Sequence, residues 1–233
     1  MMLIADALIE GDGDDTDYLL TGARLYGVYA GAFAGHDPER AGRLAARSFD
    51  YAYRALCEEL ASLCAVVERP YDLYVPELHK IDDKGDLEVL YAFASAWAGL
   101  LRAHSHDWNM VAQLPKVKAT VQHILKLDPE YDAGTAQMYA GVLESLLPPS
   151  LGGRPDLARQ HFEQAISISQ GNNLLAKVMY ARQARSLLNR PLHDRLLNEV
   201  MSADPRVDGL TLINTLAQRQ ASVLLAESVD YFE

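Results

Sequence analysis

The pattern of apolar and helix-breaking positions is sharpest between Pro148 and Ala165, PPSLGGRPDLARQHFEQA. Two prolines and two glycines interrupt any regular helix at the start of this stretch, because proline lacks the amide hydrogen and glycine is costly inside a helix. Pro155 then suits the first turn of a new helix. After it, Ala158, Phe162 and Ala165 recur at i, i+4 and i+7, on one face. The pattern predicts a helix break followed by a helix with an apolar face.

This face of small, aromatic and small residues lets a second helix approach closely, and it is typical of the second helix of a tetratricopeptide repeat. The preceding stretch, 138–143, carries the small residues that a first helix needs at a close crossing. The segment GHDPERA, 35–41, resembles GRPDLA, 153–158, so we expect an internal repeat. We therefore predict an all-α fold of about four tetratricopeptide-like helical hairpins, stacked as a right-handed superhelix with a C-terminal capping helix over 210–232.

Other stretches complete the predicted organisation. Residues 17–35 are rich in small residues and tyrosine and predict a helix, as do residues 87–104, which are apolar nearly all round and should be deeply buried. Residues 66–88 are irregular, with a short helix expected over 75–81. We predict that residues 1–16 are disordered or left over from cloning, and that residues 17–233 form a single helical repeat domain.

Composition narrows the classes of function. The 233 residues are 49% hydrophobic, which suffices for a sizeable core, and the formal net charge is −11. A negative charge of this size argues against nucleic acid as a partner and against docking on anionic lipid. No stretch has the length of continuous apolar sequence that a membrane span requires.

The two cysteines, Cys57 and Cys64, are seven positions apart. On one continuous helix this spacing separates them by roughly 10 Å along the axis, whereas a disulfide needs Cα atoms within about 7 Å. We therefore expect two buried thiols that act as small hydrophobic residues. A metal or redox pair is less favoured, because no CxxC motif or neighbouring histidine supports it.

Several runs together resemble one family. These are LDPEYDAG, YAGVLESLLPPSLGGRPDLARQHFEQAI and NNLLAKVMYARQ, together with the stretches 92–117 and 37–57. They resemble the T component of TRAP transporters, the TatT family, over roughly residues 17–230. The sharpest element is the PPxLGG insertion, 148–153, followed by a repeat-type second helix.

The resemblance implies a non-catalytic periplasmic accessory with cryptic tetratricopeptide-like hairpins. It implies a homotrimer that docks the extracytoplasmic solute-binding protein, or P component, and a hydrophobic channel that takes an apolar or amphipathic solute. It also implies a lipid-anchored precursor, although the N-terminus MMLIADALIEGDGDD contains no signal peptide or lipobox cysteine. The alternative function is a generic tetratricopeptide adaptor that binds a peptide in its concave groove.

Five residues are candidates for the channel wall, each with a structural alternative. Tyr139 and Tyr180 occupy similar positions in successive first helices, and Lys177 lies one turn before Tyr180. In one interpretation the tyrosines fill the core and the lysine pairs with an acid. In the other, the three residues form a channel wall that binds an amphipathic anion. Tyr91 and Trp97 allow the same two readings.

The chain offers little that indicates an enzyme. His104, His106 and Asp107 form an HxHD run that could ligate a metal, but they fall at a helix break where polar residues are expected as a solvated loop or cap. We find no GxSxG, HExxH or glycine-rich phosphate loop. We therefore expect no catalytic residues, no metal and no cofactor.

Overall fold

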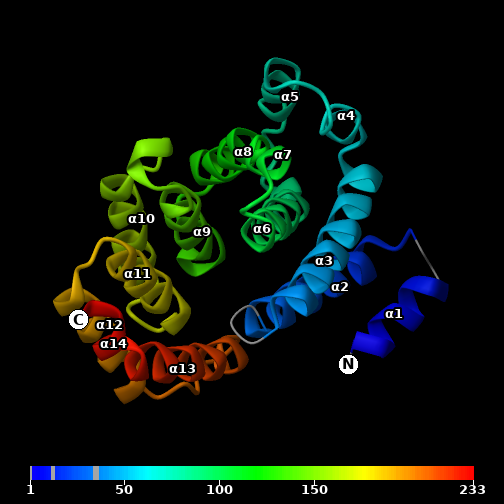
Figure 1. Ribbon diagram of the computed structural model, residues 1–233. Coiled ribbons are helices and arrows are strands. Elements are labelled where there is room, and N and C mark those ends of the chain that lie inside the picture. The colour runs from blue at the N-terminus through cyan, green and yellow to red at the C-terminus, as the bar shows by residue number, and fades with distance from the viewer. Residues whose placement is uncertain (1, 12–13, 34–36) are drawn as a thin grey trace. The chain divides into compact units, whose positions relative to one another are not determined.

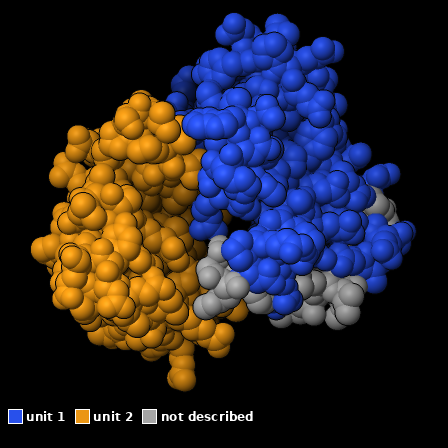
Figure 2. All heavy atoms as spheres, in the orientation of Figure 1, with its two compact units in different colours: residues 1–128 blue, residues 129–233 orange. Residues whose placement is uncertain are grey.

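The computed structural model describes residues 2–11, 14–33 and 37–233, and every regular element among them is a helix. The all-α prediction is confirmed, whereas the right-handed superhelix stays a prediction. The chain divides into two compact units, Met1–Asp128 and Pro129–Glu233 (Figures 1 and 2). Within the described ranges, no helix is both long enough and apolar enough to cross a membrane.

Unit 1 contains the first eight α-helices and one 3-10 turn. In chain order these are α1 (Met2–Gly11), α2 (Thr16–Phe33), α3 (Pro38–Glu59), α4 (Ala61–Cys64), α5 (Tyr71–Leu78), η1 (Lys84–Asp86), α6 (Leu87–Ala103), α7 (Trp108–Val111) and α8 (Leu114–Leu127). Helix α6 packs against α2, α3 and α8, and it is buried along most of its length, as its apolar sequence predicts. The short helix expected over 75–81 begins earlier, directly after Pro70, and ends at Leu78.

An aromatic cluster fills the centre of unit 1. The Phe93 and Trp97 rings of α6 lie 5.0 Å apart between centroids, and Phe49 of α3 lies 5.7 Å from Phe93. Tyr74 of α5 meets Trp97 edge to face at 6.2 Å. This cluster joins three helices that are distant in sequence, and it fixes the position of α5.

Helix α1 lies in the stretch for which we expected disorder. Its Asp6 carboxylate accepts hydrogen bonds of 2.6 Å from the hydroxyls of Tyr26 in α2 and Tyr51 in α3. Burial opposes the ionisation of Asp6, but these two hydrogen bonds and the Arg47 charge outweigh it and lower the pKa of the carboxyl group. Burial and the bond to Asp6 raise the pKa of Tyr26 to about 12. The division into an N-terminal stretch and one repeat domain stays a prediction.

The prediction of two free thiols is wrong, because Cys57 and Cys64 form a disulfide with a Cα separation of 5.0 Å. Our estimate assumed one continuous helix. The structure ends α3 at Glu59, gives Leu60 a non-helical φ of −124° and ψ of 53°, and begins α4 at Ala61. This break folds α4 back and brings the second cysteine within reach of the first.

Unit 2 consists of helices in consecutive antiparallel pairs. Its elements are η2 (Tyr131–Gly134), α9 (Thr135–Ser145), η3 (Pro149–Leu151), α10 (Pro155–Ile168), α11 (Leu174–Ser186), α12 (Arg190–Ser202), α13 (Thr211–Ala226) and α14 (Ser228–Phe232). Helix α9 packs on α10, α11 packs on α12, and α13 lies against α11 and α12. The expected single helix over 210–232 is in fact two, with a break at Glu227.

The helix break and restart at the PPxLGG insertion are confirmed. Ala158, Phe162 and Ala165 are all at least 99% buried, as their spacing predicts. A Cβ atom added at Gly141 of α9 would lie 2.8 Å from the Phe162 ring. Glycine is therefore required where α9 and α10 cross, because any side chain would displace the aromatic ring beneath it.

Candidate functional site

Three buried polar side chains lie at i, i+4 and i+7 on α8, and all three reach the irregular segment 66–81. The Lys116 ammonium donates a hydrogen bond of 2.8 Å to the Val67 carbonyl oxygen. The Thr120 and Tyr74 hydroxyls are 2.7 Å apart, and His123 Nε2 lies 2.7 Å from the Ile81 carbonyl oxygen. This polar stripe attaches the segment to α8 at three regularly spaced points.

The stripe sits in a low-dielectric environment, and burial shifts the pKa values of its groups. Burial raises the pKa of Tyr74 well above its usual value, and the hydrogen bond with Thr120 opposes this shift only in part. Burial lowers the pKa of His123 more than the bond to Ile81 raises it. Since a carbonyl oxygen can only accept, Nε2 of His123 carries the proton of this hydrogen bond, and Nδ1 is buried with no partner among the described residues.

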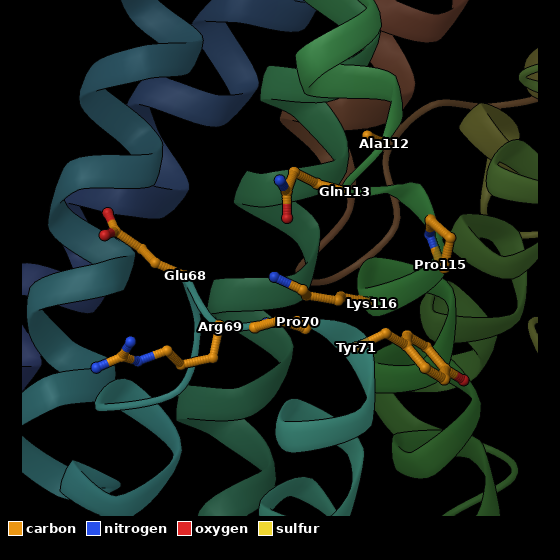
Figure 3. A pocket seen from close by; sticks show the side chains of 8 residues that line it. All are labelled: Glu68, Arg69, Pro70, Tyr71, Ala112, Gln113, Pro115 and Lys116. Atoms are coloured by element: carbon orange, nitrogen blue, oxygen red, sulfur yellow. The ribbon is translucent and has the colours of Figure 1, made fainter.

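A pocket of about 300 Å³ opens beside the first residue of this stripe (Figure 3). We call it the Lys116 pocket. One wall is the segment before α5 with the first residue of that helix, and the other is the junction of α7 and α8. Its lining residues are Glu68, Arg69, Pro70, Tyr71, Ala112, Gln113, Pro115 and Lys116.

Lys116 is the most buried polar residue of the lining, at 6% exposure. Its nitrogen lies 5.9 Å from the centroid of the Tyr74 ring and forms no ion pair within the part of the chain that the structure describes. Burial lowers the pKa of the Lys116 ammonium, and the nearby charge of Glu68 opposes this shift only in part. Among the described residues, the Lys116 ammonium therefore forms no ion pair, although the Glu68 charge lies near enough to affect its pKa.

The rim adds further donors and an apolar surface. In the described residues, neither the Arg69 guanidinium nor the Gln113 side-chain amide has a hydrogen bond or ion pair. Figure 3 shows the Lys116 amine and the Gln113 amide pointing to the side of the segment that carries Glu68 and Arg69. The charged ends of Glu68 and Arg69 extend outward, and the Tyr71 ring points to the opposite side. Chemically, the arrangement can hold a small anion but shows no nucleophile with an activating base.

None of the five residues predicted for a channel wall lines this pocket. Trp97 is 3% exposed within the aromatic cluster of unit 1, and Tyr91 is partly buried on the same helix. In unit 2, Tyr139 packs against the core that contains Tyr180. The structure thus places two of the five in unit 1 and three in unit 2, and their role in ligand binding stays a prediction.

Tyr180 and Lys177 have the surroundings of our structural alternative. The Tyr180 ring stacks on Phe162 with centroids 5.5 Å apart, and its hydroxyl donates to Glu163 at 3.1 Å. Burial, and then the bond to Glu163, raise the pKa of Tyr180 to about 12. Lys177 forms an ion pair of 2.8 Å with Glu199. Both polar groups are thus satisfied within unit 2.

Sequence reasoning missed Lys116, although a signal was present. Lysine, threonine and histidine at i, i+4 and i+7 form a polar stripe on a helix that is otherwise apolar on its inner side. A polar stripe of this kind is normally read as the solvated face. Only the position of segment 66–81 shows that this stripe is buried.

The HxHD run has a structural place at the junction of two helices. His104 ends α6, and the Asp107 side chain caps α7 by accepting from the Asn109 amide at 2.9 Å. The rings of His104 and His106 have centroids 6.2 Å apart. In the described residues, no three histidine, cysteine, aspartate or glutamate side chains gather in a group that could hold a metal ion.

The family model of TRAP transporter T-components matches residues 1–232. A search of curated proteins found no match. The family match covers both compact units, so it applies to the chain as a whole and not to one of its helical repeats.

Proposed function

The chain belongs to the TRAP transporter T-component family, and we propose on that basis that it is a periplasmic accessory which binds the solute-binding P component of its transporter. The observation that carries the proposal is the family match over residues 1–232. A T component is an accessory of the transporter, so we propose that binding, without catalysis, is its task.

The disulfide supports the periplasmic location independently of the family. Cys57 and Cys64 are bonded across the α3–α4 break, and the described residues include no free cysteine. Disulfides persist in oxidising compartments such as the bacterial periplasm and are rare where glutathione and thioredoxin keep thiols reduced. Lipid anchoring of a precursor, and a homotrimer, remain parts of the proposal.

The proposal is tested by binding between the two purified proteins. The chain, with its disulfide intact, is immobilised and titrated with the P component of the same transporter, and binding is followed by biolayer interferometry. The control analyte is a solute-binding protein of similar size from an unrelated transporter. We expect saturable binding of the P component alone. Absence of binding at high micromolar concentration, or equal binding of the control, would refute the proposal.

The same preparation distinguishes the alternative function and the assembly. A generic tetratricopeptide adaptor should bind a peptide of its partner as well as the folded partner, whereas we expect only folded P component to bind. Sedimentation at high micromolar concentration tests the homotrimer, and a single monomeric species would contradict it.

A further inference from the structure

The Lys116 pocket is open to solvent, but the lysine in its lining is buried and has an unusual balance of charge. An ammonium group has three N–H donors, and the described residues give Lys116 one acceptor, the Val67 carbonyl oxygen. A buried charge is normally paired with an opposite charge, because an isolated ion loses its hydration without compensation. Lys116 is 6% exposed. Glu68 is the acid whose charge affects the Lys116 pKa, but it forms no ion pair with the ammonium.

The geometry points to a binding site for the carboxylate of a small organic acid in the Lys116 pocket, with Lys116 as its main contact. A carboxylate supplies the missing negative charge and accepts charge-assisted hydrogen bonds, which are about twice as strong as neutral ones. Gln113 lies one turn before Lys116 at the start of α8 and offers an amide N–H that has no other partner. Arg69 is an exposed second cation at the rim.

The rest of the lining favours an organic acid over an inorganic anion. Pro70, Ala112 and Pro115 supply apolar surface in the same lining. Small-molecule sites combine apolar surface with a few placed polar groups, and a volume of about 300 Å³ is at the lower end of the range for such sites. A compact acid with one carboxylate therefore fits, since a second charge would face Glu68.

The test uses benzoate and its neutral analogue benzamide, which have nearly the same shape. Each is titrated into the full-length protein, and amide signals are followed by two-dimensional NMR. We expect benzoate to shift the signals of residues 67–71 and 112–117. Benzamide should bind about tenfold or more weakly, because its carbonyl oxygen still accepts a hydrogen bond but carries no negative charge to pair with the ammonium. Glu68→Gln should strengthen benzoate binding, since it removes the competing negative charge.

Matched variants separate a binding role from a structural one. Lys116→Met keeps the length of the side chain and should weaken benzoate binding about tenfold or more. Lys126→Met, an exposed position in the last turn of the same helix, should bind as wild type does. Gln113→Ala leaves Lys116 in place and should weaken binding by a smaller factor.

The inference fails if benzoate leaves the signals of residues 67–71 and 112–117 unchanged, if benzamide binds equally well, or if Lys116→Met binds as wild type does. The inference does not depend on the association with the P component. The benzoate titration can therefore fail while the P-component binding assay succeeds, and the reverse also holds.

Discussion

The two units each contain a largely buried lysine, and the two lysines have opposite surroundings. Lys177 of unit 2 has a side chain 15% exposed and pairs with Glu199 at 2.8 Å. Among the described residues, Lys116 of unit 1 donates to a backbone oxygen, pairs with no acid and lines a pocket. In our proposal, the paired lysine stabilises the fold of its own unit, whereas the lysine without an acid binds a carboxylate.

Two further contacts in unit 2 follow the pattern of Lys177. The Glu144 carboxylate is 3% exposed and receives two hydrogen bonds from Arg154, at 2.7 and 2.8 Å. His161 Nδ1 lies 2.7 Å from the Gln137 amide oxygen. These two contacts join α9 to α10 and the residue before it, and substitutions there should act on stability.

The largest effect is expected from Tyr180→Ala in the core of unit 2. Removing a ring that is 95% buried and stacked on Phe162 should cost about 3–5 kcal/mol of unfolding free energy, as other large aromatic truncations do. Tyr71→Ala is the control, because this ring is 45% exposed and should matter little for stability. Chemical denaturation measures both. If Tyr180→Ala unfolds at the wild-type midpoint, the residue is a channel wall and not core.

The next effect concerns the disulfide of unit 1. Replacing Cys57 and Cys64 together by serine releases a short loop, for which chain entropy predicts a loss of roughly 2–3 kcal/mol. The loss should appear as faster hydrogen exchange in α3 and α4, with exchange in α9–α12 unchanged, because the cross-link lies within unit 1. Uniform acceleration across both units would contradict this assignment.

A smaller effect separates the two lysines directly. Glu199→Gln removes the acid from Lys177, and we expect a loss of about 0.5–1 kcal/mol, because the Glu199 side chain is partly exposed and its charge is screened. Glu68→Gln, the matched change near Lys116, should leave the unfolding free energy within about 0.5 kcal/mol of wild type, as surface substitutions usually do. Equal losses in the two variants would remove the distinction between the lysines.

The smallest expected effect is a pH dependence from His123. Burial lowers its pKa in the folded protein below the usual 6.5. As the pH falls through 6.5, the unfolded chain binds a proton before the folded one does, so stability decreases from there down to the folded pKa. His123→Gln keeps a donor toward Ile81 and should show a shallower decrease in melting temperature over this interval. An identical decrease would exclude this role.

Local patterns in the sequence predicted much of the helical framework. Pro38 and Pro155 begin helices as expected, and the face of Ala158, Phe162 and Ala165 is buried. These features depend on helix period and on proline geometry, which act over a few residues. The same rules failed at Leu60, where no glycine or proline marks the break and where the disulfide is formed.

The candidate site could not be predicted in the same way. Lys177 was proposed because it lies on a helix expected to be buried, but the sequence does not show that Glu199, on the next helix, reaches it. Lys116 was not predicted as a site residue, because its burial depends on segment 66–81, and the sequence of that segment follows no regular period. Contacts between distant segments decide both outcomes, and a single sequence does not record them.

The most direct test follows the lysine side chains themselves. Carbon-13 NMR of the Cε atoms reports the protonation of Lys116 as the pH is raised, with and without benzoate, and the Cε signal of Lys177 is recorded in the same samples. We predict that the pKa of Lys116 lies below the usual value for lysine, that benzoate raises it, and that benzoate leaves the Lys177 signal unchanged. A Lys116 pKa that does not respond to benzoate, or an equal response at Lys177, would contradict the assignment of one lysine to binding and the other to the fold.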